Sequence, residues 1–180
     1  MKKTKWFDRK FNFDSQQNIF PSIIERLIGT PARLEEKMKN IPPETLEIKL
    51  DGAWSIKENI GHLTDLEPLW QGRLQDFLHA EKELRPTDLA NRKTDEANHN
   101  SKPLDELLKE FRQVRMETIA MIENLDDEIV FRSALHPRLK TPMRTMDSFL
   151  FVAEHDDHHL ARITEIGKNE VKGNGAEKSA

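Results

Sequence analysis

The chain has 180 residues, of which 33% are charged and 36% hydrophobic, and its formal net charge at pH 7 is −4. This length fits a single domain that is large enough to bury a core. Seven glycines and no tyrosine favour a helical protein over a sheet-rich one. The negative net charge gives little support for nucleic acid binding, and the absence of cysteine excludes disulfides, thiolate metal ligands and a cysteine nucleophile.

The N-terminal residues are basic but carry no apolar signal core, and no segment of the chain is apolar enough to span a membrane. We therefore expect a cytoplasmic protein without a membrane partner. Residues 1–19 are expected to form an N-terminal extension, residues 20–167 the folded domain, and residues 168–180 a flexible C-terminal tail.

The first two helical segments are marked by apolar periodicity and by a helix start signal. The first covers about residues 21–40, and Pro31 is expected to kink or break it. The second begins after Ser55, because the sequence from Ser55 to Glu58 has the form of a capping box. It continues to about residue 80, and Pro68 is expected to bend it.

Two further helical segments follow, at about residues 103–125 and 145–166. The linkers that precede them, residues 84–100 and 126–144, are polar and show no convincing alternating pattern. Four long amphipathic helices without strands predict an all-α fold, a four-helix bundle.

Two histidines, His155 and His159, lie four residues apart in the fourth segment. A rotation of about 100° per residue places them about 40° apart on the apolar side of the helix, with His158 turned toward the solvent side. Side chains at this spacing stack on one helix face and can chelate a single metal ion. An interpretation of equal weight is that His155 and His159 are ordinary residues of the bundle that bind no metal, because Asp156 or Asp157 could pair with either ring.

A third histidine, His62, lies at the edge of the apolar face of the second segment. Such a residue is more often a hydrogen-bonded boundary residue than a ligand, and the residues alone do not show that the second and fourth segments are neighbours. If they are, three imidazoles would form a site with open positions, which suits catalysis better than structure. The other histidines, His79, His99 and His136, are expected to be exposed.

The loop before the fourth segment carries four basic residues. Such a group is usually a solvated surface and less often a rim that binds anions. Its members are Arg132, Arg138, Lys140 and Arg144.

Three motifs together resemble the DinB/YfiT-like superfamily. They are GTPARL at residues 29–34, WSIKENIGHL at 54–63 and EHDDHHL at 154–160. The resemblance covers about residues 20–166, and it implies an up-and-down four-helix bundle in which the second and fourth helices are neighbours.

The resemblance also implies a divalent-metal site. Its ligands fall on His62, His155 and His159 of this sequence. It further implies zinc or nickel as the metal and a homodimer as the assembly, although three imidazoles also suit cobalt and iron(II).

Three functions remain open for such a site. The leading hypothesis is a metal-dependent thiol S-transferase, which joins a low-molecular-weight thiol such as bacillithiol to a small-molecule electrophile. The alternatives are a metal-dependent hydrolase and a non-catalytic metal-binding stress-response protein. In each case Asp156, Asp65 and Glu58 are candidates to orient an imidazole N–H.

Overall fold

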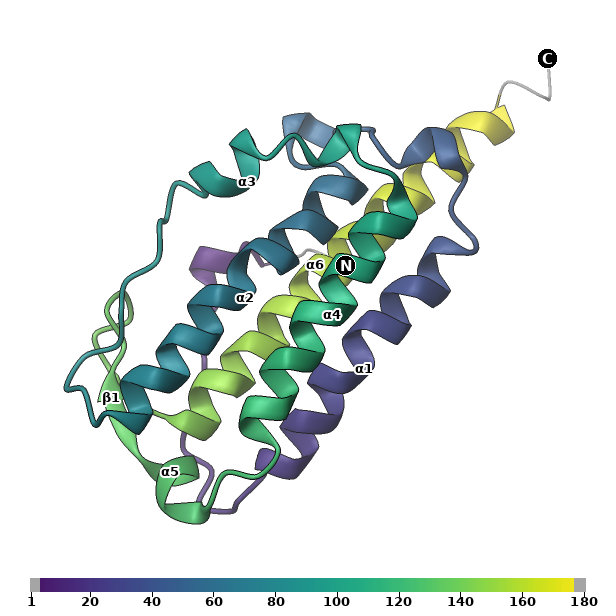
Figure 1. Cartoon of the computed structure of the whole chain (residues 1–180). Helices are drawn as coiled ribbons and strands as arrows, with labels where there is room; N and C mark the ends of the chain where they lie inside the picture. Colours follow the sequence, from purple (N-terminus) through teal and green to yellow (C-terminus); the bar gives the residue numbers. More distant parts are fainter. Residues whose placement is uncertain (1–3, 177–180) are drawn as a thin grey trace.

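The computed structural model describes residues 4–176, with side chains as far as Lys168. Four long helices form a bundle, as predicted (Figure 1). They are α1 (Phe20–Met38), α2 (Ile56–Leu78), α4 (Leu104–Ile122) and α6 (Thr145–Ala176). Helix α6 is longer than expected and enters the predicted tail, whose last residues, 177–180, lie outside the described part of the chain.

The linkers contain short elements that the sequence did not predict. The helical ones are η1 (Trp6–Asp8), η2 (Pro43–Thr45), η3 (Leu50–Gly52), α3 (Arg92–Glu96), η4 (His99–Ser101) and α5 (Asp127–Phe131). Strands β1 (Ser133–Leu135) and β2 (Pro142–Arg144) pair antiparallel, with Ala134 opposite Met143. The prediction of a linker without strands was wrong here, because three residues on each side are too few to show an alternating pattern.

The helix signals in the sequence have clear structural counterparts. The predicted capping box is present, with the Ser55 hydroxyl accepting from the Glu58 N–H and the Glu58 carboxylate accepting from the Ser55 N–H. Pro31 lies inside α1 without breaking it. Because proline has no N–H to donate to the Leu27 carbonyl, that oxygen is left for Arg115, whose Nη1 lies 3.4 Å away.

The helices do not alternate strictly in direction around the bundle. Helix α1 contacts α4 and α6, and α2 contacts the same two helices, so α1 and α2 lie diagonally opposite each other. Figure 1 shows α1 and α6 running one way while α2 and α4 run the other. This topology requires the segment between α2 and α4, residues 79–103, to return along the bundle, which explains why this linker is so long.

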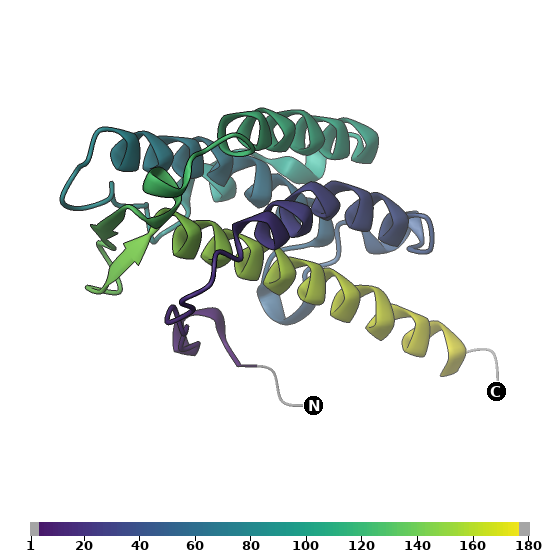
Figure 2. The ribbon, with the colours of Figure 1, turned by 90° about the horizontal axis from the view of Figure 1, so that it is seen from below.

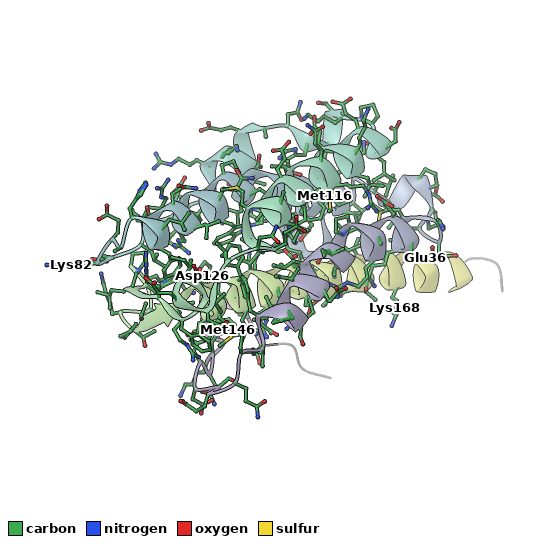
Figure 3. The ribbon with its side chains drawn as sticks, turned by 60° about the horizontal axis from the view of Figure 1, so that its bottom comes forward. Glu36, Lys82, Met116, Asp126, Met146 and Lys168 are labelled. Atoms are coloured by element: carbon green, nitrogen blue, oxygen red, sulfur yellow. The ribbon has the colours of Figure 1, made fainter. Side chains whose placement is uncertain are left out.

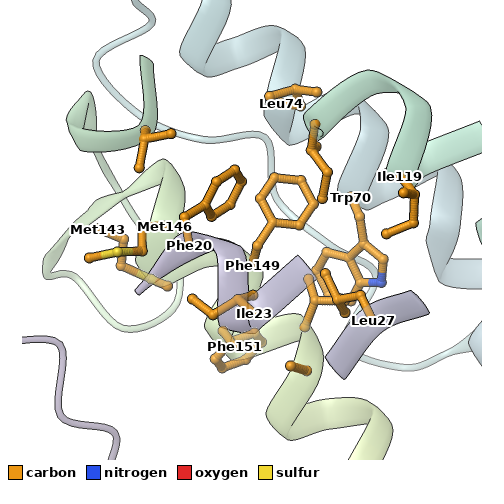
Figure 4. Packing of buried hydrophobic residues seen from close by; sticks show 14 residues of the cluster. Phe20, Ile23, Leu27, Trp70, Leu74, Ile119, Met143, Met146, Phe149 and Phe151 are labelled. Atoms are coloured by element: carbon orange, nitrogen blue, oxygen red, sulfur yellow. The ribbon is translucent and has the colours of Figure 1, made fainter. Parts of the chain in front are cut away.

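The bundle interior has two apolar clusters with a polar layer between them. The first lies where α1 and α6 begin and contains Phe20, Leu27, Trp70, Ile119 and Phe149 among others (Figure 4). The second lies at the opposite end and contains Leu34, Ile60, Phe111, Leu160 and Ile163 among others. The layer between the clusters holds the buried charged residues and the histidines described below.

Charged side chains such as Glu36, Lys82 and Lys168 lie on the outside of the bundle (Figure 3). The predicted N-terminal extension packs against α6, on its outer side (Figure 2). There the Trp6 ring contacts Phe151 at 5.0 Å between centroids. Within the described residues, no helix has the length and apolar character needed to cross a bilayer.

Candidate metal centre

Three histidines from two helices meet in the polar layer. His62 comes from α2, and His155 and His159 come from successive turns of α6. Each ring offers one nitrogen such that the three nitrogens lie within 4.8 Å of one another, and the Nε2 atoms of His155 and His159 are 3.1 Å apart. All three residues are at least 94% buried, whereas His158 is half-buried beside them, as the helical wheel predicts. The structure therefore brings together the three residues that the sequence singled out.

Asn59 fixes the orientation of the His159 ring. Its side-chain N–H₂ group donates to the carbonyls of Trp54 (3.1 Å) and Ser55 (2.7 Å), so its Oδ1 must face His159. That oxygen lies 2.7 Å from Nδ1 of His159 and can only accept a hydrogen bond. The proton of a neutral His159 ring is therefore on Nδ1, and the Nε2 lone pair faces the other histidines.

A second chain of hydrogen bonds fixes His62. The Thr94 hydroxyl donates to Asp65 (2.9 Å) and accepts from Nδ1 of His62 (3.0 Å). Asp65 also accepts from Nε2 of His99 (2.8 Å). Gly61 makes room for this arrangement, since a Cβ there would lie 2.2 Å from the His99 ring. The Nε2 lone pair of His62 is thus also directed at the cluster.

The titration behaviour of these groups fits a set of neutral ligands. Burial lowers the pKa of His62 to about 4 and outweighs the opposing effect of Asp65. Burial also lowers the pKa of His155 well below its usual range, and His62 and His158 add to this effect. For Asp65, burial acts to raise the pKa, but hydrogen bonds from His99 and Thr94 leave it below its usual value. Near pH 7 His62 and His155 are therefore neutral, beside an ionised Asp65.

The donor set fits a divalent transition metal. Neutral imidazoles whose second nitrogen donates to an oxygen are the usual form of metal-binding histidine, and His62 and His159 both have this form. Ligands at about 2.0–2.1 Å from a tetrahedral zinc lie roughly 3.3 Å apart, which is close to the 3.1 Å between His155 and His159.

The cluster forms part of the wall of a cavity of about 390 Å³. Aromatic side chains supply much of the remaining wall, with Trp54 centred 4.4 Å from His62, Trp70 6.0 Å from His155, and Trp6 5.1 Å from His155. This volume lies within the range of about 300–1,000 Å³ for small-molecule sites. A metal at the three histidines would therefore be accessible to a small organic substrate in a cavity with largely aromatic walls.

Several site predictions require correction. Asp156 does not contact an imidazole, because it faces the bundle axis and binds Arg115 and Thr30. Glu58 caps α2 and pairs with Lys49. Of the three predicted orienting carboxylates, only Asp65 acts on a candidate ligand, and it does so through Thr94.

Two histidines that we expected to be exposed are buried, namely His99 and His136. Both lie in linkers that fold back against the bundle, His99 against Gly61 and His136 against Phe151. His79 is exposed as predicted.

The sequence reasoning also missed Asn59, Thr94 and Trp6. Asn59 had a usable signal, since it precedes His62 by three residues and so lies on the same helix face. Thr94 and Trp6 come from a linker and from the N-terminal extension, where no periodicity indicates which side chain turns inward.

Residues 26–163, more than half of the chain, match the sequence model of the DinB superfamily. The chain belongs to the DinB superfamily. A solved structure, YfiT from Bacillus subtilis, is similar over 90% of this chain and 93% of that one, with a TM-score of 0.78 and 21% sequence identity. YfiT is described as a probable metal-dependent hydrolase with an unusual four-helix bundle topology.

No curated protein sequence gives a significant match. At 21% identity the likeness to YfiT shows a shared fold. The family resemblance that we drew from the three motifs is confirmed by the match of residues 26–163.

Proposed function

We propose that the protein is a metal-dependent enzyme that activates the nucleophile of a small-molecule reaction, most specifically a thiol S-transferase. The observation that carries the proposal is the convergence of three buried histidines, two of them with their Nε2 lone pairs fixed by hydrogen bonds, on one wall of a cavity. A divalent metal bound there lowers the pKa of a coordinated thiol or water, so that the nucleophilic form is available near neutral pH.

The residues of this chain have separate tasks in such a reaction. His62, His155 and His159 would hold the metal as neutral ligands. Asn59 and the pair of Thr94 and Asp65 keep two of these rings in the binding tautomer. The aromatic walls surround the reacting groups and lower the local dielectric constant, which strengthens the effect of the metal charge.

The cavity composition favours thiol transfer over a mechanism with a carboxylate base. Among the described residues that line the cavity, only Asp88 carries a carboxylate. Its oxygens already accept from the backbone N–H groups of Ala90 (3.0 Å) and Arg92 (3.1 Å). Thiol transfer would need no protein base, because a metal held by the three histidines would supply the lowered thiol pKa; since the chain has no cysteine, the sulfur would come from the small-molecule thiol.

A metal-dependent hydrolase is the second candidate. The fold similarity to YfiT, with its description as a probable metal-dependent hydrolase, is the observation in its favour. A divalent metal held by His62, His155 and His159 would supply an activated water for hydrolysis.

The first test is metal content. Untagged protein, purified without chelator, is expected to contain close to one equivalent of a transition metal by plasma mass spectrometry. The His155→Ala variant is expected to lose it, because two remaining imidazoles do not suffice. His79→Ala is the matched control, since His79 is an exposed histidine on the same protein. Metal loss in both variants, or in neither, contradicts the site.

The second test separates the reactions. Zinc- and nickel-loaded protein is incubated with an electrophile such as chlorodinitrobenzene and with bacillithiol, cysteine or glutathione, and in parallel with p-nitrophenyl acetate without a thiol. Conjugation that requires both metal and thiol supports the transferase. Ester hydrolysis without a thiol would contradict the transferase and support the hydrolase. Tight metal binding with neither activity would support a non-catalytic metal-binding protein.

A further inference from the structure

A second group of polar side chains lines the same cavity, beyond Trp70 and Phe151. Arg73 lies three turns after His62 in α2, about 16 Å along the helix axis. Its guanidinium group packs over Trp70, and that of Arg138, from the loop between β1 and β2, packs over Phe151. Trp70 in turn contacts His155. An apolar stretch therefore separates this basic group from the histidine cluster.

Arg73 is buried without a full set of acceptors. Only 2% of its surface is exposed. Its Nε donates to the Arg85 carbonyl at 3.2 Å, but its Nη2 is buried and has no hydrogen-bond partner. The nearby carboxylate of Asp76 is bound by Arg85, with contacts of 2.7 to 3.1 Å. Burial lowers the pKa of Arg73 to about 10, so the group still carries its charge near pH 7.

His136 adds another donor at the same place. Its Nδ1 accepts from the backbone N–H groups of Arg138 (3.2 Å) and Leu139 (3.1 Å). A neutral ring must therefore carry its proton on Nε2, and burial together with Arg73 and Arg138 keeps the pKa low, at about 4. The Nε2 of His136 lies 3.3 Å from Nη1 of Arg73. Both atoms are donors, so they do not bond to each other and can share one acceptor.

Arg138 completes the group. Its Nη2 is buried and has no hydrogen-bond partner, and burial lowers its pKa. The other three basic residues of the predicted loop are engaged elsewhere: Arg132 with the carbonyls of Phe77 and Leu78, Arg144 with Asp147, and Lys140 with Glu83. Of the four basic loop residues that the sequence analysis considered as an anion-binding rim, Arg138 is thus the one that lines the cavity. Arg73, from α2, lines the cavity beside it.

We propose that Arg73, Arg138 and His136 bind an oxyanion group, a carboxylate or a phosphate, of the substrate. Two guanidinium groups and an imidazole N–H offer only hydrogen-bond donors here. An oxyanion offers only acceptors, so it matches this group. That the anion belongs to the substrate of the histidine site rests on the proposed function. The substrate is then an elongated molecule with its reactive group at the histidines, an apolar middle along Trp70 and Phe151, whose rings pack edge to face, and its anionic end at Arg73.

The test uses metal-free protein, so that no metal can bind the anion. Wild-type protein treated with chelator is titrated with 4-phenylbutyrate, with phenethyl phosphate and with the uncharged 4-phenylbutanamide. Binding is followed by isothermal titration calorimetry and by tryptophan fluorescence, since Trp6, Trp54 and Trp70 line the cavity. At least one anion is expected to bind about tenfold or more tightly than the amide. The tighter of the two anions identifies the group.

Three variants assign the effect to these residues. Arg138→Gln and Arg73→Gln are each expected to weaken anion binding about tenfold or more and to leave amide binding unchanged. Lys140→Gln removes a charge from the same loop, but this ammonium group pairs with Glu83, and its loss is expected to have little effect. Arg138 is the less buried of the two arginines, so its variant remains informative if Arg73→Gln does not fold.

Equal binding of the anions and the amide by wild-type protein would overturn the proposal, as would wild-type anion affinity in Arg138→Gln. These outcomes are separable from those for the proposed function. Anion binding lost in Arg138→Gln supports the oxyanion site even if no reaction is found. Metal-dependent turnover without anion binding would support the proposed function and contradict the oxyanion site.

Discussion

Two sets of polar groups, one around the bundle axis and one along the cavity, differ in one respect. Around the axis, Arg115 is 1% exposed and binds Glu67 (2.6 Å) and Asp156 (2.5 Å), and none of its nitrogens lacks a partner. On the cavity side, nitrogens of Arg73, Arg138 and His155 are buried without one. The first group is complete within the protein, whereas the second has capacity left for a ligand.

The adjacent residues His155 and Asp156 show how one helix serves both groups. Successive residues of α6 point about 100° apart, so His155 faces the cavity while Asp156 faces the axis. There Asp156 also accepts from the Thr30 hydroxyl at 2.9 Å, and Thr118 donates to Glu67. The network thus joins all four long helices and fixes α6 at the height of the histidines. Among the described residues, Thr64, His99 and Thr145 also have a buried side-chain atom without a partner, but only Arg73, Arg138 and His155 line the cavity. A buried polar atom without a partner in a native protein calls for an explanation, and a bound ligand is one.

The strongest test of this contrast is the removal of Arg115. The Arg115→Met variant leaves Glu67 and Asp156 buried without their cation, and we expect it to lower the free energy of unfolding by about 3–5 kcal/mol. The measurement is urea denaturation at pH 7. Arg112→Met, one turn earlier in α4, removes a partly exposed ion pair with Glu35 and is expected to cost less than about 1 kcal/mol. Similar losses in the two variants would mean that the network is not a special support of the fold.

A smaller effect is expected when an orienting residue on the cavity side is changed. Thr94→Val keeps the shape of the side chain but removes the acceptor of the His62 Nδ1–H. Metal affinity, measured by competition with a chromogenic chelator, is expected to fall by about 10- to 100-fold. Thr164→Val, on the far part of α6, is the control, because its hydroxyl bonds only to the Leu160 carbonyl and the Lys37 ammonium group among the described residues, and neither lines the cavity. An unchanged metal affinity in Thr94→Val would contradict the role of Thr94 and Asp65 in orienting His62.

The smallest effect concerns pH. The pKa of His136 is about 4 in the folded protein and about 6.5 in the unfolded chain, so the unfolded state binds more protons between these values. The stability of metal-free protein is therefore expected to be fully present above pH 6.5 and to decrease as the pH falls toward 4. His136→Asn should make the slope of the urea midpoint against pH shallower. His62 also has a lowered pKa and contributes in the same direction, so part of the slope remains.

An identical slope in His136→Asn and wild type would contradict a neutral, buried His136. It would also weaken the assignment of its Nε2–H as a donor for an anion.

Features that depend on interactions between residues close in sequence could be predicted, whereas features that depend on contacts between distant residues could not. The four long helices could be predicted because their apolar periods are continuous, and the Ser55 cap because its signal lies within four residues. The positions of His155 and His159 on the buried face of α6 followed from the helical period alone. Asp156 was assigned to the wrong group, because nothing local distinguishes a carboxylate that faces a histidine from one that faces Arg115. The homodimer and the cytoplasmic location remain predictions.

The sequence by itself determined the helices, the pair of histidines and, through its three motifs, the DinB superfamily. Only the tertiary structure decided which linker residues reach the site, how the helices run relative to one another, and which arginines lose their acceptors. The physical reason is that periodicity and capping act over a few residues, whereas these contacts join distant parts of the chain. Thr94 reaches His62 across 32 positions, and Arg73 reaches His136 across 63.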